Sequence, residues 1–193
     1  MSRCQAYCGP QKCDCEVYEQ LAYPEMKPRA LPPLFKWAHI SECGKYRYTL
    51  ERRWDHGPLL PFIMLNPSTA DADIDDPTIR RCMGFACREG FGGIIVGNLF
   101  AFRATDPKVM LAAPNRVGPL NEKTLFDIAT RAWLEEVPIV AAWGSNADGK
   151  GGFTVARLRG IGATVKCLGM TKGGEPRYPL YVKGDQPLVE YRK

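Results

Sequence analysis

Two asparagines stand at the ends of two apolar runs, and their side chains suggest a binding site. Asn66 follows residues 60–65, and Asn98 ends residues 94–98. An asparagine amide offers two donors and one acceptor, which is the set needed to read the edge of a nucleobase. Because the carboxyl ends of parallel strands meet at one edge of a sheet, we expect both side chains in one crevice.

Other polar and aromatic side chains follow the expected strands at the same edge. They are Phe100, Phe102, Trp143, Ser145, Asn146 and Tyr178. Aromatic rings beside an amide can stack on a base that the amide reads. A plainer interpretation stays open, since an asparagine before a proline often starts a turn and Trp143 equally fits a core.

The acidic residues and histidines limit the catalytic mechanisms that the sequence can support. Four aspartates follow Asn66 in the chain, at Asp71, Asp73, Asp75 and Asp76. Such a run is usually a solvated loop, although one carboxylate can orient a water molecule. The two histidines, His39 and His56, lie away from the expected strand ends, so a Ser-His-Asp or Cys-His arrangement is not expected. The common nucleotide-loop and metalloprotease motifs are also absent from the sequence.

The hydrophobic pattern predicts the elements that position these residues. The core strands are expected at residues 60–65, 94–98, 139–143 and 164–168, and a half-exposed strand at residues 46–54. Helical spacing covers residues 77–89, 121–135 and 153–159, the first beginning with Asp76 before Pro77. The order predicts a three-layer α/β/α fold with a central, mostly parallel four-stranded sheet.

Length and composition indicate one ordinary globular domain. The chain has 193 residues, of which 45% are hydrophobic and 24% charged. A net charge of +5 permits a nucleic-acid partner without requiring one. We assign residues 1–33 to a cysteine- and proline-rich arm and residues 34–193 to the domain. Without a signal peptide or a long apolar run, we expect a cytoplasmic protein with neither a membrane nor an obligate protein partner.

The cysteines leave two interpretations open. Half of the eight lie in the first fifteen residues, at Cys4, Cys8, Cys13 and Cys15. Their thiolates can close a tetrahedral zinc site, or the segment is a tail without metal. The other cysteines, among them Cys43, are expected to be buried small residues.

Several motifs identify residues 46–181 as resembling an uncharacterised bacterial and phage domain family of unknown function. The motifs are NPSTAD, DDPT, NLFAFRATDP, AWG and the G-x-P-R-x-PLY ending. The family label itself implies no activity.

More remotely, the motif order resembles the uracil-DNA glycosylase superfamily. Asn66 in LNPS matches the asparagine that positions the attacking water, and Asn98 matches the residue that reads the base edge. The AAWGSNA segment is similar to a strand found across that superfamily. Residues 177–181 lie where those enzymes carry a histidine-proline motif that contacts the base and wedges the minor groove. Here Tyr178 replaces the histidine, and Ser68 stands where glycine is usual.

The resemblance implies a DNA glycosylase that flips a damaged or modified base out of DNA and hydrolyses its N-glycosidic bond, in DNA repair or in a phage setting. The catalytic residues would be Asn66, Asp71 and Tyr178. The base-binding residues would be Asn98, Phe100, Phe102, Ser145 and Asn146. The DNA-binding residues would be Ser68, Arg103, Lys172, Arg177, Leu180 and Tyr181. Catalysis would need no cofactor. Because some branches of the superfamily hold an iron-sulfur cluster, the N-terminal cysteines could bind a structural iron-sulfur cluster instead of zinc.

Two other hypotheses remain. One is a non-catalytic module that binds DNA or a modified base, which the missing histidine favours. The other is an enzyme that acts on free nucleotides in phage base modification. Salt-dependent DNA binding without an abasic product would indicate the first, and turnover of a mononucleotide without duplex affinity the second.

Overall fold

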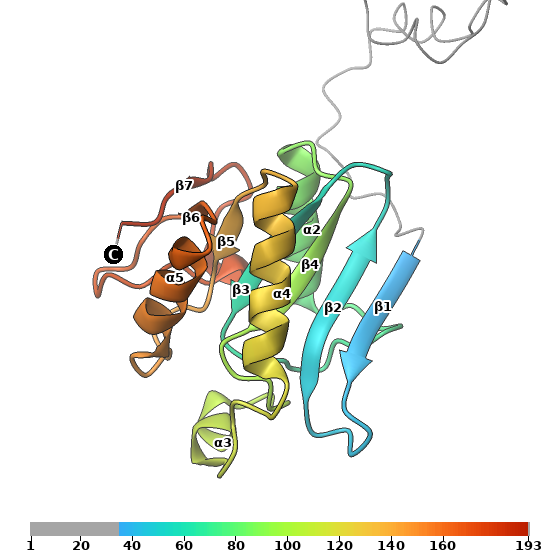
Figure 1. Ribbon diagram of the computed structural model, residues 1–193, viewed down its shortest axis with the longest axis vertical. Coiled ribbons are helices and arrows are strands. Elements are labelled where there is room, and N and C mark those ends of the chain that lie inside the picture. Colours follow the sequence, from blue (N-terminus) through green and yellow to red (C-terminus); the bar gives the residue numbers. More distant parts are fainter. Residues whose placement is uncertain (1–34, 193) are drawn as a thin grey trace, which may run out of the picture.

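The apolar runs form the middle of one seven-stranded sheet (Figure 1). The structure, a computed structural model, describes residues 35–192, so the expected arm with Cys4, Cys8, Cys13 and Cys15 lies outside the described residues. The strands are β1 (Phe35–Ile40), β2 (Arg47–Arg53), β3 (Leu59–Met64), β4 (Gly93–Asn98), β5 (Ile139–Ala141), β6 (Val165–Cys167) and β7 (Val189–Glu190). Their order across the sheet is β1-β2-β4-β3-β5-β6-β7.

The pairing confirms a mixed α/β class but corrects the expected sheet. Strands β4, β3, β5 and β6 pair in parallel, whereas β1 with β2, β2 with β4, and β6 with β7 are antiparallel. The sheet therefore has seven strands and not four, with as many antiparallel as parallel pairings. The sequence pattern missed β1 because Phe35 and Trp37 are exposed on this edge strand, and β7 because it spans two residues.

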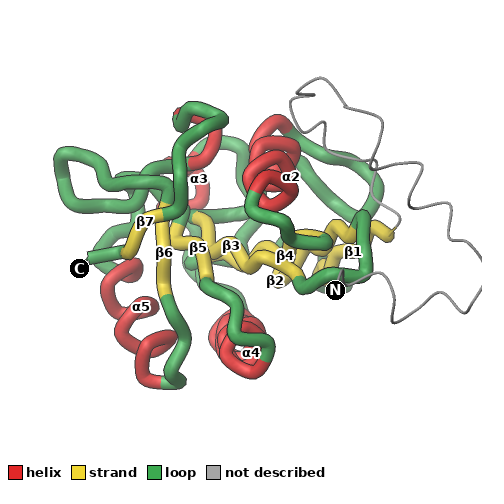
Figure 2. The backbone as a smooth tube through the Cα atoms, turned by 90° about the horizontal axis from the view of Figure 1, so that it is seen from above, coloured by secondary structure: helices red, strands yellow, loops and turns green. Residues whose placement is uncertain are grey.

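Helices cover both faces of the sheet. They are α2 (Pro77–Arg88), α3 (Pro107–Ala112), α4 (Asn121–Leu134), α5 (Lys150–Gly160) and the 3-10 turn η2 (Pro179–Tyr181). Figure 2 shows α2 on one face and α4 with α5 on the other. Asp76 caps α2 as expected, since its side chain accepts a hydrogen bond of 2.8 Å from the Ile79 amide and Pro77 follows it.

The order of the parallel strands creates a switch point at β3. The chain passes from β3 through α2 to its neighbour β4, and from β5 through α5 to β6 on the opposite face. The loops that follow β3 and β5 therefore leave the sheet in opposite directions. In open α/β sheets ligands bind in the crevice at such a point, outside the carboxyl ends of the strands.

A bulge in the β1–β2 hairpin places an arginine on the α2 face. The pairing with β1 slips by one residue, so that His39 faces Thr49 while Ile40 faces Arg47. The extra residue, Tyr48, reverses the alternation of side chains along β2. Arg47 therefore lies on the same face as Leu50, where it is 2% exposed.

Two glycines should respond to alanine in opposite directions. A Cβ on Gly93, between β2 and β3, would lie 2.4 Å from Leu59 Cδ2 and 2.5 Å from the Arg52 carbonyl oxygen. We expect Gly93→Ala to lower the free energy of unfolding by roughly 1–3 kcal/mol through overpacking. Gly84 in α2 has no heavy atom within 4 Å of such a Cβ, so Gly84→Ala should raise it by up to about 1 kcal/mol. Urea denaturation measures both, and equal effects would contradict the packing of Gly93.

Candidate functional site

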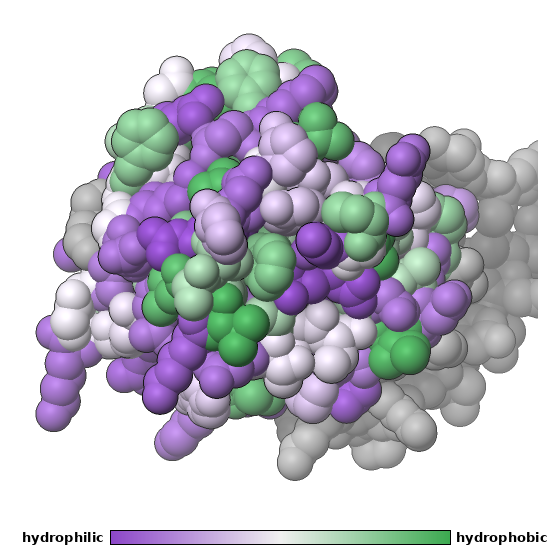
Figure 3. Space-filling model, turned by 90° about the horizontal axis from the view of Figure 1, so that it is seen from below, coloured by the Kyte–Doolittle hydropathy of each residue, from purple (hydrophilic) through white to green (hydrophobic). Residues whose placement is uncertain are grey.

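A cavity of about 780 Å³ opens at the carboxyl edge of the parallel strands. Its walls come from the β3–α2 loop and the start of α2, the β4–α3 loop, the loop after β5, and the segment around η2. This is the crevice that the switch point at β3 predicts. Figure 3 looks onto this end of the molecule and shows hydrophobic and hydrophilic side chains intermingled there.

The cavity brings together more than half of the residues singled out from the sequence. Those that line it are Asn66, Ser68, Asp76, Trp143, Ser145, Asn146, Arg177, Tyr178, Leu180 and Tyr181. Those that do not are Asp71, Asn98, Phe100, Phe102, Arg103 and Lys172. The sequence therefore located the strand ends correctly but did not distinguish lining side chains from their neighbours.

The amide of Asn66 is held by two backbone carbonyls. Its Nδ2 donates to the carbonyl oxygen of Pro67 at 3.0 Å and to that of Ala104 at 2.8 Å. Because the amide nitrogen can donate to carbonyl oxygens and the amide oxygen cannot, the nitrogen of Asn66 must be the atom that faces these two carbonyl groups. Asn66 lines the cavity, and its Oδ1 makes no hydrogen bond within residues 35–192, so the residue carries an unpaired acceptor whose amide group is held in place.

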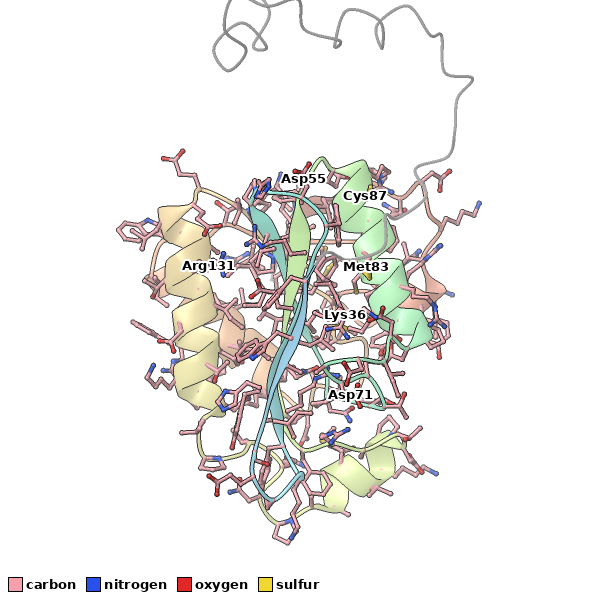
Figure 4. The ribbon with its side chains drawn as sticks, turned by 90° about the vertical axis from the view of Figure 1, so that its right-hand side faces the viewer. Lys36, Asp55, Asp71, Met83, Cys87 and Arg131 are labelled. Carbon is pink, nitrogen blue, oxygen red and sulfur yellow. The ribbon has the colours of Figure 1, made fainter. Side chains whose placement is uncertain are left out.

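Asp71 closes its own loop and does not reach the cavity. Its Oδ1 accepts hydrogen bonds of 2.9 Å from the amides of Asp73 and Ile74, and these bonds hold the pKa of Asp71 below its usual value. Figure 4 shows Asp71 in a loop on the side of the sheet that carries Met83 of α2. The carboxylate that lines the cavity is Asp76, the N-cap of α2.

Tyr178 is paired with a threonine that the sequence did not single out. Its hydroxyl donates to Thr78 Oγ1 at 3.2 Å, which links η2 to the first turn of α2. Burial raises the pKa of Tyr178, so the phenol stays protonated at neutral pH. Because Thr78 accepts from Tyr178, its own hydroxyl proton is available to a ligand. We expect Tyr178 to act on a ligand through Thr78.

The side-chain amide of Asn98 is buried and unpaired in the part of the chain that the structure describes, although its backbone carbonyl accepts from Asn121 Nδ2 at 2.9 Å. Its side chain is 1% exposed, and neither Nδ2 nor Oδ1 is paired within the described residues. Alternation along β4 places it on the α2 face with Ile94 and Val96. A buried amide of this kind is normally satisfied by a bound water or a ligand, so base reading by Asn98 stays a prediction.

A second buried polar group lies on the same face. The Arg47 guanidinium donates to the Ala70 carbonyl oxygen at 2.7 Å, but its Nε has no partner within residues 35–192. Burial lowers the pKa of Arg47 to about 10, while the charge of Asp76 opposes the shift. Arg47 thus keeps its charge at neutral pH and places positive potential near the Asp76 carboxylate.

The aromatic residues expected to stack on a base mostly pack in the core. Phe100 is 1% exposed and lies under the Arg116 guanidinium, 4.9 Å from the ring centre. Phe102 packs edge-to-face on Tyr46 and faces a groove beside the cavity. Trp143 forms a cavity wall, but it is 1% exposed and its Nε1 donates to Glu175 Oε2 at 2.8 Å. Of these rings, Trp143 alone borders the cavity.

Tyr191, which packs on Trp143, should make stability fall at high pH. Its buried hydroxyl has no hydrogen-bond partner within residues 35–192, and burial, reinforced by Glu175, raises its pKa to about 12. The unfolded chain releases this proton near pH 10, so the folded state loses stability between about pH 10 and 12. Tyr191→Phe should make that loss shallower and leave stability at neutral pH unchanged or higher. Urea denaturation against pH tests this, with exposed Tyr181→Phe as the control; identical slopes would contradict it.

Thr78, in the first turn of α2, is the main lining residue that was not singled out from the sequence, whereas Asp76 was among the four aspartates considered there. Asp76 and Thr78 line the cavity because α2 begins at the carboxyl edge of the sheet. The available signal was the DDPT motif, which ends the loop after core strand β3 and starts α2. Residues 35–192 contain no group of three or more His, Cys, Asp or Glu side chains placed to hold a metal ion. Within the same range, no helix is long and apolar enough to cross a bilayer.

Comparison with known proteins places the chain in a family without assigning an activity. No curated protein and no solved structure matches it. A family model described as a protein of unknown function, DUF1643, matches residues 47–180, which begins at the buried Arg47 and ends within η2. The cavity walls fall almost entirely inside this range. The chain therefore belongs to the DUF1643 family.

Proposed function

We propose that the protein is a DNA glycosylase-like enzyme that takes a damaged or modified base, flipped out of DNA, into the cavity and hydrolyses its N-glycosidic bond. The observation that carries the proposal is Asn66, a lining residue of the cavity whose amide nitrogen is held by two carbonyl groups and whose oxygen is unpaired within residues 35–192. Parallel strands β4, β3, β5 and β6, with helices on both faces, support a glycosylase-like arrangement.

The size and walls of the cavity suit a flipped nucleotide. A volume of about 780 Å³ falls within the usual range for small-molecule sites, and it exceeds what a base alone requires. Hydrophobic side chains of Leu65, Trp143 and Leu180 share the walls with amide, hydroxyl and carboxylate groups. A base bound here would meet apolar surface on its faces and polar groups at its edges.

The lining residues can serve both halves of the reaction. The glycosidic bond breaks toward a cationic sugar and a base anion, so the site needs a positioned water and donors to the base. In this proposal Asn66 Oδ1 and the Asp76 carboxylate accept hydrogen bonds from the water. The Thr78 hydroxyl, polarised by Tyr178, donates to the departing base. Arg177 at the cavity and Lys172 in the adjacent loop are the proposed phosphate contacts, and exposed Leu180 or Tyr181 the wedge.

A non-catalytic binding module is the second candidate. It is favoured by Tyr178, because the hydroxyl already donates to Thr78 and a neutral phenol cannot replace the proton chemistry of an imidazole. Such a module would bind DNA in a salt-dependent manner and release no base.

The deciding experiment is an abasic-site assay with the purified protein. DNAs that contain uracil, hydroxymethylated or glycosylated pyrimidines, and alkylated or deaminated purines are incubated with it, and alkali then converts abasic sites to strand breaks. Cleavage of one substrate would support the enzyme and identify the base. Binding without cleavage on any substrate would favour the module, and turnover of mononucleotides alone would favour an enzyme of free nucleotides.

A further inference from the structure

A second groove lies beside the cavity, next to the β1–β2 turn. It has a volume of about 520 Å³ and shares the wall residues Ser68, Thr69, Ala104 and Thr105 with the cavity. Its far side is made by the turn between β1 and β2 and by the β4–α3 loop. The groove and the cavity are therefore adjacent, so a chain with one nucleotide in the cavity can place its next residue in the groove.

The groove is lined by cations, hydroxyls and one aromatic ring, with no carboxylate among its lining side chains. Lys45 is exposed and forms no ion pair within the described residues. Arg103 uses Nη1 to donate to the Gly44 carbonyl oxygen at 3.2 Å, and its Nε has no partner in that part of the chain. Together with Ser68 and Thr69, these groups form a donor set that suits a phosphate.

The β1–β2 turn is held rigidly against the β4–α3 loop. The Arg103 amide donates to the Lys45 carbonyl oxygen at 2.9 Å, and Tyr46 and Phe102 form an antiparallel bridge. Lys45 and Arg103 are consequently kept on adjacent strands of backbone before any ligand arrives, and less ordering is needed on binding.

We infer that this groove binds the phosphodiester next to the nucleotide that occupies the cavity, with Lys45 and Arg103 on the phosphate. The ring of Phe102, which faces the groove, is available to the neighbouring base or sugar. The inference rests on the proposed function only in taking a nucleotide of a strand as the occupant of the cavity. It gives the β1–β2 hairpin, which lies outside the parallel part of the sheet, a role in holding the strand.

Binding of a fluorescently labelled single-stranded oligonucleotide tests the groove, read by anisotropy at about 50 to 200 mM salt. Lys45→Ala and Arg103→Gln should each weaken binding roughly 3- to 10-fold and reduce the slope of log affinity against log salt by about 0.7. Lys123→Ala on α4, whose side chain is 75% exposed, is the matched control and should change neither value. If all three variants behave alike, the groove does not bind phosphate.

The exposed Cys43 thiol provides a second measurement that needs no substitution in the groove. Cys43 lines the groove and is exposed, contrary to the expectation of burial, and its hydrogen bond to Ser41 lowers its pKa, which favours alkylation. Bound oligonucleotide should slow alkylation of Cys43 by iodoacetamide at least about 3-fold, as measured by peptide mass spectrometry, whereas a mononucleotide should not. Equal alkylation rates with and without oligonucleotide would overturn the inference.

The outcomes separate this inference from the proposed enzyme. Protection of Cys43 and the loss of affinity in Lys45→Ala, without base release from any DNA, would retain the groove and reject the glycosylase. Base release that is unaffected by Lys45→Ala at limiting DNA would retain the enzyme and reject the groove.

Discussion

Asn66→Ala is expected to lower the rate of base release at saturating DNA by at least about 100-fold, while DNA affinity changes little. The alanine removes the Oδ1 acceptor that we propose holds the attacking water, and it also frees the carbonyl groups of Pro67 and Ala104. Because the side chain interacts with the water and not with phosphate, the effect should appear in kcat more than in KM. Single-turnover kinetics on the substrate identified by the abasic-site assay measures this split.

Two further variants test whether the effect is specific to position 66 and whether it depends on the anchored amide nitrogen. Asn115 also bonds to backbone, accepting from the Gly118 amide at 3.1 Å, but it does not line the cavity, so Asn115→Ala should keep full activity. In Asn66→Asp a carboxylate oxygen would face two carbonyl oxygens, so we expect this near-isostere to lose activity as well. Full activity in either Asn66 variant would remove Asn66 from the mechanism.

The sequence predicted elements best where burial is uniform. Strands β3 and β4 are buried along their whole length, and such continuous apolar runs are typical of central parallel strands. The start of α2 was predicted because the N-cap Asp76 and Pro77 act locally. Edge strand β1 lacks a buried face of this kind, and the bulge at Tyr48 depends on pairing with another segment. Neither feature has a local signal.

Prediction of the candidate site from the sequence has the same limit, because the position of a side chain depends on contacts with distant segments. The sequence marks Asp76 as a helix N-cap but does not show which aspartate after Asn66 reaches the cavity; only the folded loop shows that Asp71 closes a turn while Asp76 lines the cavity. Tyr178 and Thr78 are 100 positions apart, so their hydrogen bond cannot be inferred from spacing. Sequence reasoning therefore located the edge of the sheet, and long-range contacts select the side chains that act there.

Arg52 joins the β1–β2 hairpin to the loop that leads into α2. The side chain is completely buried, and its Nε donates to Asp75 Oδ1 at 2.6 Å. Its Nη1 donates to the carbonyl oxygens of Glu51 and Trp37, and its Nη2 to those of Asp71 and Ile74. One guanidinium thus satisfies five acceptors, four of them backbone carbonyls, and orders the loop that carries Asp76.

Arg52→Met should therefore lower the free energy of unfolding by about 3–5 kcal/mol, because it leaves the Asp75 carboxylate and several carbonyl groups without their donor. Lys36, whose Nζ is 3.5 Å from Asp75, compensates in part and favours the lower end of this range. Neighbouring Arg53 is the control: it is partly exposed and 3.8 Å from Glu51, so Arg53→Met should cost less than about 1 kcal/mol. Urea denaturation gives both values. Comparable losses in the two variants would show that the buried guanidinium does not hold the loop, and the ordered position of Asp76 at the cavity would then need another cause.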